Sequence, residues 1–281
     1  MKKPSFGTYL FLSLVLLFLY VPIVIVVLYS FNNNPARIPL EFTGFTTQWY
    51  ENLFTGKSGY GSALWLSFQV AVGSVLLSIV VGSLGAIGMA QRTIQYRKSP
   101  SKADKLMDSL ISLPIMIPEI ILGFALMVLF NLIGISDNLL RLILAHTTFC
   151  IPYIYLSVKS RLAGIEQSLF DAARDLGASP LAVMRDITIP LCMPAIISGA
   201  ALAFAMSMDD FVISFFVYGV GQGTLPIMIY SSVKVGVSLQ VNALCTIIIV
   251  VIFTSFALSQ FISLRKRPQT MQTSTLANSN V

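Results

Sequence analysis

The sequence predicts an all-α membrane protein with six transmembrane helices. Apolar residues make up 56% of the 281 residues and charged residues only 11%, less than half of the share usual in soluble domains. Six apolar runs of about 20 residues or more follow one another along the chain. The basic residues gather in alternate loops between these runs, as they do in multi-pass membrane proteins.

Each apolar run is long enough to cross a hydrocarbon core of about 30 Å as a helix, which satisfies its own backbone hydrogen bonds. The runs cover residues 9–31, 62–90, 107–133, 139–158, 190–217 and 240–264. The first is too long for a cleavable signal peptide and has no small-residue cleavage site after it. The fourth is the least regular, since it contains Arg141, His146 and Pro152.

The loop charges predict the orientation in the membrane. With both termini in the cytoplasm, 14 Lys and Arg residues lie inside and four lie outside, and the opposite orientation reverses this bias. The inner set is Lys2, Lys3, Arg92, Arg97, Lys98, Lys102, Lys105, Lys159, Arg161, Arg174, Arg185, Arg265, Lys266 and Arg267; the outer set is Arg37, Lys57, Arg141 and Lys234. Because the charge lies beside membrane segments, no nucleic-acid partner is expected.

The main outer loop, 32–61, contains a candidate interfacial helix. Trp49, Leu53 and Phe54 would share one helical face, and Trp and Tyr favour headgroup depth. At the other end of the chain, residues 268–281 are rich in Ser, Thr, Asn and Gln and predict a disordered cytoplasmic tail. The transmembrane domain is therefore expected to cover residues 1–267.

The polar stretch between the fourth and fifth runs predicts a helix–turn–helix. Gly177 suits the left-handed conformation that often ends a helix. Ser179 and Pro180 then predict a new start, since Ser caps a helix and Pro fits its first position. Asp171 is expected in the first turn of the first helix, where a carboxylate is favoured. Pro190 is expected to end the second helix.

This stretch resembles the EAA loop of ABC-importer permeases, whose pattern is E-A-A-x3-G-x9-I-x-L-P. Asp171 stands in place of the Glu and Ile189 in place of the Leu. In that family the loop forms the coupling helices that dock onto a separate ATP-hydrolysing subunit, and the fold is the type I permease fold. The resemblance implies a coupling surface within residues 159–190, formed by Asp171, Ala172, Ala173, Asp175, Gly177, Ser179, Pro180, Ile187 and Pro190. An ordinary helical loop is the alternative.

Three carboxylates lie within apolar runs. Glu119 follows two prolines in the third run, and Asp209 and Asp210 lie deep in the fifth. A charge in hydrocarbon is costly, so these groups are expected to face a cavity, a partner or a ligand. No Lys or Arg is predicted at matching depth, so carboxylates on a shared lumen would favour a cationic solute. For Asp209 and Asp210 the alternative is hydrogen-bonded packing or gating against the other permease subunit. For Glu119 the alternative is a structural role beside two prolines whose backbone groups need partners.

The fifth run also resembles a segment, S-x-D-D-x-V-I-x-x-F, of the bacterial spermidine/putrescine permeases, in particular their second permease subunit (PotC/PotI type). The resemblance extends over nearly the whole chain and includes residues 20–22, 113–119 and 145–149. It implies polyamine import across the bacterial inner membrane. It also implies a homologous second permease, a pair of ATPase subunits and an extracytoplasmic solute-binding protein as partners.

No catalytic or cofactor site is expected in the chain itself. The phosphate-binding pattern G-x-x-x-x-G-K-[ST] does not occur, so ATP and Mg would be bound by the partner ATPase. His146 is the single histidine, and hydrogen-bonded packing is expected for it rather than metal binding. Gly82, Gly85 and Gly88, together with Ala86, predict close helix packing, with a flexible point in transport as the alternative.

Two other functions stay open. A self-sufficient secondary transporter or channel could use the buried acids to relay protons, but no internal repeat is present and the EAA-like stretch would have no role. An ABC permease for thiamine, an iron complex or an anion fits the same sequence. Copurification with an ATPase would distinguish an ABC permease from a self-sufficient transporter. Binding of candidate solutes to the extracytoplasmic solute-binding protein would distinguish a polyamine cargo from the other cargoes.

Overall fold

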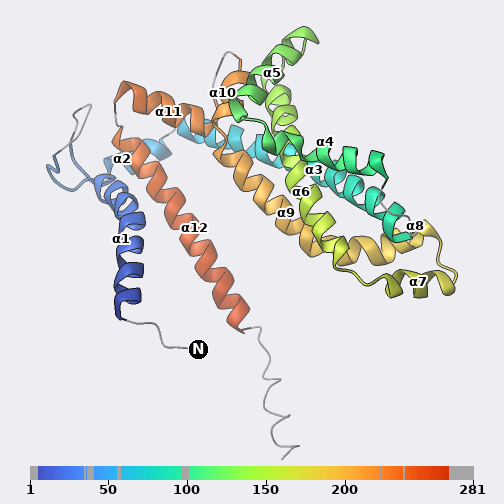
Figure 1. Cartoon of the computed structure of the whole chain (residues 1–281). Helices are drawn as coiled ribbons and strands as arrows, with labels where there is room; N and C mark the ends of the chain where they lie inside the picture. Colours follow the sequence, from blue (N-terminus) through green and yellow to red (C-terminus); the bar gives the residue numbers. More distant parts are fainter. Residues whose placement is uncertain are drawn as a thin grey trace, which may run out of the picture. The chain divides into compact units, whose positions relative to one another are not determined.

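A computed structural model describes residues 6–34, 36, 41–55, 58–95, 101–219, 221, 223–236 and 238–265, without the side chains of 91–95, 259 and 262–265. The expected tail, 268–281, lies outside these residues. The chain divides into two compact units, Gly59–Ser231 and Met1–Ser58 with Ser232–Val281. Apart from one isolated bridge, regular structure in the described ranges is helical (Figure 1).

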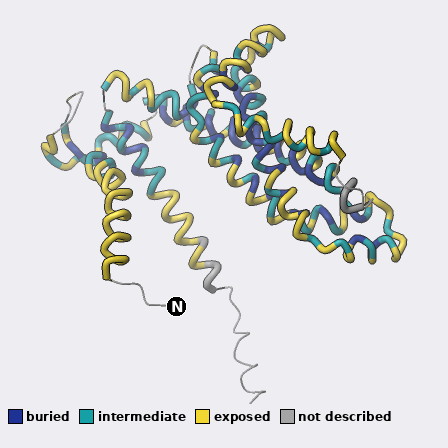
Figure 2. Tube along the Cα trace, in the orientation of Figure 1, coloured by how far each residue is buried: buried dark blue, intermediate teal, exposed yellow. Residues whose placement is uncertain are grey.

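Three long helices form the core of the unit Gly59–Ser231. They are α3 (Tyr60–Gln95), α6 (Asn138–Ala163) and α9 (Ile189–Asp209), and each packs against the other two. Glycines allow the close approach: a Cβ added at Gly82 of α3 would lie 3.0 Å from the Ile151 carbonyl oxygen of α6. Small residues at such contacts are typical of membrane helices. Figure 2 shows the buried residues concentrated along these helices.

The third apolar run is two helices rather than one. α4 (Lys102–Met116) and α5 (Glu119–Leu132) meet at an angle of 103°. Ile117 between them is extended, with φ −75° and ψ 132°. Pro118 explains the break, because proline disfavours the helical conformation of the preceding residue and cannot donate a helical hydrogen bond. α4 packs against α6.

The fifth apolar run is also interrupted. α9 ends at Asp209, Asp210 is extended with φ −65° and ψ 118°, and the short α10 (Val212–Val217) follows. α10 packs against α5 and α6. The expected single span of 190–217 was therefore wrong at its outer end, where Asp210 separates two helices. The next helix, α11 (Leu225–Val235), begins where the Leu225 N–H donates to Ser67 Oγ at 2.8 Å.

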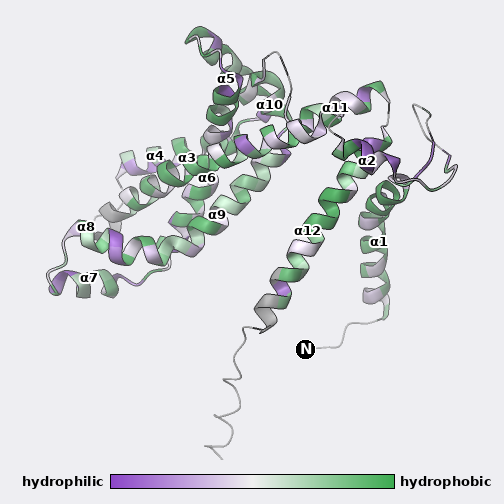
Figure 3. Cartoon of the chain, turned by 180° about the vertical axis from the view of Figure 1, so that it is seen from behind, coloured by the Kyte–Doolittle hydropathy of each residue, from purple (hydrophilic) through white to green (hydrophobic). Residues whose placement is uncertain are grey.

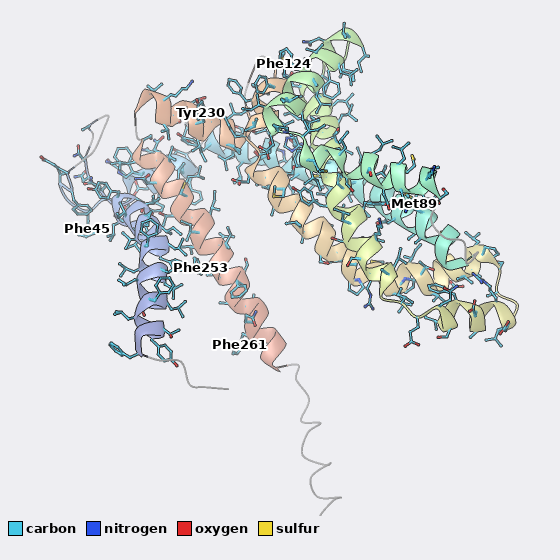
Figure 4. All side chains as sticks on the ribbon, viewed as in Figure 1. Phe45, Met89, Phe124, Tyr230, Phe253 and Phe261 are labelled. Carbon is cyan, nitrogen blue, oxygen red and sulfur yellow. The ribbon has the colours of Figure 1, made fainter. Side chains whose placement is uncertain are left out.

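The other unit contains α1 (Phe6–Tyr29), α2 (Gln48–Phe54) and α12 (Leu239–Arg265). Both α1 and α2 pack against α12. The expected short outer helix is present as α2, and its Trp49 Nε1 donates to the Asn32 carbonyl at 2.8 Å. α1 has no buried residue. On α12 the labelled Phe253 and Phe261 are more than half exposed, as suits a lipid-facing surface (Figure 4).

Within the described residues, five helices are long and apolar enough to cross a membrane, and the bent pair α4–α5 makes a sixth if it is one span. The predicted all-α membrane fold with six apolar segments is confirmed. The irregular fourth run proved to be a single helix, α6, with Pro152 inside it. Figure 3 shows apolar residues along α9 and α12 and hydrophilic residues at α7, in the polar stretch between α6 and α9.

Candidate functional site

The polar stretch between α6 and α9 forms the predicted helix–turn–helix. α7 (Gln167–Asp175) ends in a reversal at Gly177, whose φ is +81°. The Gly177 N–H donates to the Arg174 carbonyl at 2.8 Å, and the Ala178 N–H donates to the Ala173 carbonyl at 3.0 Å. This pair of bonds is the Schellman arrangement, in which a left-handed glycine closes the helix end.

The second helix of the stretch starts where the sequence predicts. α8 (Pro180–Val183) has Pro180 at its first position, and Ser179 Oγ accepts a hydrogen bond from the Ala182 N–H at 3.3 Å. A serine cap followed by proline satisfies the first amide groups of a helix without strain. The second helix therefore begins three residues after Gly177.

Two details of the stretch differ from expectation. Asp171 lies in the second turn of α7, because the helix already begins at Gln167, and its carboxylate pairs with Arg174 at 3.3 Å. Pro190 does not end a helix. α8 continues through a π-helical segment, η1 (Met184–Thr188), into α9, and the Ile189 N–H bonds to the Met184 carbonyl. This wide turn accommodates a proline that cannot donate to the preceding turn.

The helix–turn–helix has a packed side and an exposed side. Phe170, Ala173 and Val183 form a small buried cluster, with Ile187 packed against it. Leu176 is 88% exposed and Leu181 67% exposed. The exposed candidates are Ala172, Asp175, Gly177, Ser179, Pro180 and Pro190, whereas Ala173 is buried and Asp171 and Ile187 are half-buried.

Several exposed apolar side chains on a polar segment are typical of a surface that contacts another molecule. Leu169, 42% exposed, also belongs to the apolar residues of this segment. Sequence reasoning did not single it out, although its position seven residues before Leu176 was a usable signal, since residues at that spacing share a helical face. We name the exposed set Leu169, Ala172, Leu176 and Leu181 the coupling patch, after the role that the resemblance to ABC-importer permeases implies for this stretch.

The three carboxylates from the apolar runs line one cavity of about 200 Å³. Glu119 comes from the first turn of α5, Asp209 from the end of α9, and Asp210 from the extended link to α10. Aromatic rings form part of the same wall, and they belong to Phe149, Tyr153 and Phe211. The breaks after Met116 and Asp209 thus bring together acids that are 90 residues apart in the sequence.

The three acids differ in burial. Glu119 and Asp209 are exposed in this chain. The Asp210 side chain is only 5% exposed. Its carboxylate accepts hydrogen bonds from the Ile213 N–H at 3.2 Å, from the Ser214 N–H at 2.8 Å and from the Ser214 hydroxyl at 2.7 Å. Asp210 therefore caps α10 within this chain, whereas the packing role left open for it was against another permease subunit.

His146 lies beside Asp210 and is almost fully buried, with 1% of its side chain exposed. Its Nε2 is 3.4 Å from Asp210 Oδ2 and 2.9 Å from Ser214 Oγ, and its Nδ1 is 2.7 Å from Ser207 Oγ. The expectation of hydrogen-bonded packing for this histidine is confirmed. Its partners were not predicted.

Comparison with known proteins identifies the family. The profile of the family described as "Binding-protein-dependent transport system inner membrane component" matches residues 78–267. The chain belongs to this family. The matched range includes the helix–turn–helix and the acid-lined cavity. The protein is thus a multi-pass inner-membrane transport subunit and not an enzyme, and its resemblance to the spermidine/putrescine permeases is confirmed by its relatives.

Two relatives are similar over most of the permease chain. The "Spermidine/putrescine transport system permease protein PotC" of Haemophilus influenzae is 40% identical over 253 residues, which are 90% of this chain and 95% of that protein. The "Putrescine transport system permease protein PotI" of Escherichia coli K12 is 38% identical over 238 residues, which are 83% and 82% of the two chains.

The solved structures support the fold of the permease. A chain in the crystal structure of "a bacterial ABC transporter involved in the import of the acidic polysaccharide alginate" aligns with a TM-score of 0.60. The alignment covers 95% of this chain and 100% of that one, at 16% sequence identity. At this identity the likeness shows the fold, and it agrees with the six-helix permease expected from the sequence.

Proposed function

We propose that this permease is one of two membrane subunits of an ATP-driven importer for polyamines such as spermidine and putrescine. The observation that carries the proposal is the cavity in which Glu119 and Asp209 stand exposed beside aromatic rings. Carboxylates attract ammonium groups, and the face of an aromatic ring adds a cation–π attraction. Relatives named for spermidine and putrescine, at 38–40% identity, support the same cargo.

The proposal includes partners that complete the transport path. Glu119 and Asp209 would face a lumen shared with a homologous second permease, which explains two exposed carboxylates among apolar helices. The coupling patch would dock onto an ATPase pair that binds ATP and Mg. A solute-binding protein would deliver the polyamine from outside, and the lipid bilayer would cover the apolar outer surface. Closure of the ATPase pair would then move the helix–turn–helix and, through α9, the cavity.

Neutralising the exposed acids tests the cargo. We expect Glu119→Gln and Asp209→Asn each to lower polyamine uptake by about tenfold. A carboxylate 4 Å from an ammonium attracts it by roughly 4 kcal/mol at an effective dielectric of about 20, and easier burial of the neutral group offsets part of this. The measurement is uptake of radiolabelled spermidine and putrescine into vesicles that contain the whole importer.

A matched control for these substitutions is Glu51→Gln, which removes an exposed acid of α2 outside the cavity. Uptake by this variant should equal that of the unmodified protein. Copurification with the ATPase confirms that each variant is assembled. Assembled Glu119→Gln and Asp209→Asn variants that import polyamines at the unmodified rate would contradict a cationic lumen in this cavity.

We also propose that both termini lie in the cytoplasm, on the side of the coupling patch. A cysteine in place of Ala103, exposed at the start of α4, should react with a membrane-impermeant maleimide only from the cytoplasmic face. A cysteine in place of Ser136, exposed between α5 and α6, should react only from outside. The bias of basic loop residues predicts this result. The unmodified protein gives the background of its own cysteines, and the reverse labelling would overturn the orientation.

A further inference from the structure

We infer that His146 is a positioning residue for the cavity: its ring holds the junction between α9 and α10 and thereby sets where Asp209 presents its carboxylate. The inference rests on the proposed function, because it assigns a transport role to a residue that does not line the cavity. It is carried by three distances from one buried ring to groups on both sides of the helix break.

The ring bridges the two helices that the break separates. His146 Nδ1 lies 2.7 Å from the hydroxyl oxygen of Ser207, in the last turn of α9. His146 Nε2 lies 2.9 Å from the hydroxyl oxygen of Ser214, within α10. All three side chains are buried. A single planar group on α6 therefore fixes the distance and the angle between the end of α9 and the start of α10.

For a neutral ring, the hydrogen-bond donors in this network follow from the geometry. An ionised carboxylate only accepts, so the single hydroxyl proton of Ser214 goes to Asp210 Oδ2, 2.7 Å away. Ser214 Oγ must then accept the proton of His146 Nε2–H. In the neutral ring Nδ1 carries no proton and accepts from the Ser207 hydroxyl. Each polar atom of the buried ring then has a partner, which a buried polar network requires.

The two sides of the ring are not equivalent. Ser207 has a second neighbour, since Ser74 Oγ lies 3.5 Å from Ser207 Oγ and Ser74 gives its own proton to the Ala71 carbonyl. If Nδ1 is lost, the Ser207 hydroxyl can therefore still donate to Ser74 Oγ. The Nε2 side holds Ser214 and the capping carboxylate of Asp210. We expect the Nε2–H bond to be the one that positions the junction.

Two substitutions separate the two sides. The amide of glutamine reaches the place of the ring Nε2, whereas the shorter amide of asparagine reaches only the place of Nδ1. His146→Asn should lower polyamine uptake about tenfold, because it removes the donor to Ser214, and His146→Gln should stay within about threefold of the unmodified permease. Both variants bury one neutral amide, but asparagine is one methylene shorter and leaves more empty space, so the comparison is interpreted together with a double substitution.

A double substitution tests whether His146 acts through Asp209. If the ring positions that carboxylate, Asp209→Asn should lower uptake much less in the His146→Asn background than in the unmodified protein. The half-saturating polyamine concentration should rise in His146→Asn, while the amount of permease that copurifies with the ATPase stays unchanged. Equal uptake by the Gln and Asn variants, or fully additive losses, would overturn the inference.

A spectroscopic measurement does not depend on the cargo. His146 is the single histidine of the chain, so the difference between ¹⁵N-histidine NMR spectra of complexes with the unmodified and His146→Gln permease isolates its signals. We expect the neutral ring with the proton on Nε2, and a shift of that signal in Ser214→Ala. A proton on Nδ1, or no shift, would contradict the assignment. An importer that takes up no polyamine would refute the proposed cargo and leave this result standing.

Discussion

Replacing Gly177 by Val is expected to remove most ATP-driven import while the permease stays folded in the membrane. Gly177 has a φ of +81°, and a Cβ added there meets nothing within 4 Å. The cost of the substitution is therefore backbone strain, about 1–2 kcal/mol for an ordinary side chain and more for a β-branched one. Relief of that strain would rotate α8 away from α7 and disrupt the coupling patch.

The chain offers a matched control for this substitution. Gly134, after α5, has a φ of +75° and equally open surroundings. Gly134→Val should suffer similar strain but leave import largely intact, since it lies outside the coupling stretch. Gly177→Asn should recover much of the loss, because Asn tolerates the left-handed conformation. Uptake and ATPase retention are measured for all three, and equal losses in Gly134→Val and Gly177→Val would contradict a coupling role.

Replacing Gly82 by Val is expected to destabilise the fold itself. An added Cβ at Gly82 would lie 3.0 Å from the Ile151 carbonyl oxygen and 3.3 Å from the Tyr155 amide nitrogen. These are backbone atoms of α6, so they cannot move without separating two core helices. Overpacking of this kind costs about 1–3 kcal/mol. The purified yield in detergent and the midpoint of thermal unfolding should both fall.

Gly88 on the same helix is the control for Gly82. It is exposed, and no described atom lies within 4 Å of an added Cβ. Gly88→Val should therefore leave the unfolding midpoint close to that of the unmodified protein. The three glycines of the predicted stripe therefore differ in how closely they pack, because only at Gly82 would an added Cβ meet the backbone of α6. Equal destabilisation by both substitutions would contradict this difference.

Much of the fold could be predicted from local patterns in the sequence. Apolar runs of membrane length gave the long helices, since hydrocarbon demands internally bonded helices. The helix–turn–helix was predicted from Gly177, Ser179 and Pro180 because caps and left-handed turns depend on neighbouring residues. Pro118 was also a local signal for the break in the third run. The run was nevertheless predicted as one span because its apolar composition is continuous.

Contacts between distant residues could not be predicted in this way. The bonds of His146 to Ser207 and Ser214 join residues 61 and 68 positions apart, and no local pattern encodes such pairs. The same holds for the roles of Asp209 and Asp210, which are neighbours in sequence with opposite environments. Asp210 turns inward to cap α10 and Asp209 remains exposed because the helix ends between them.

The uninterrupted helical path from Pro180 to Asp209 has a mechanical consequence. It is 30 residues long, so a straight path at 1.5 Å per residue would be a rod of roughly 45 Å with the helix–turn–helix at one end and Asp209 at the other. A tilt of only about 5° about one end of such a rod displaces the other by about 4 Å. A small motion of the helix–turn–helix is then geometrically sufficient to carry a carboxylate across the width of an ammonium-bearing chain, if neither the π-helical segment Met184–Thr188 nor Pro194 bends.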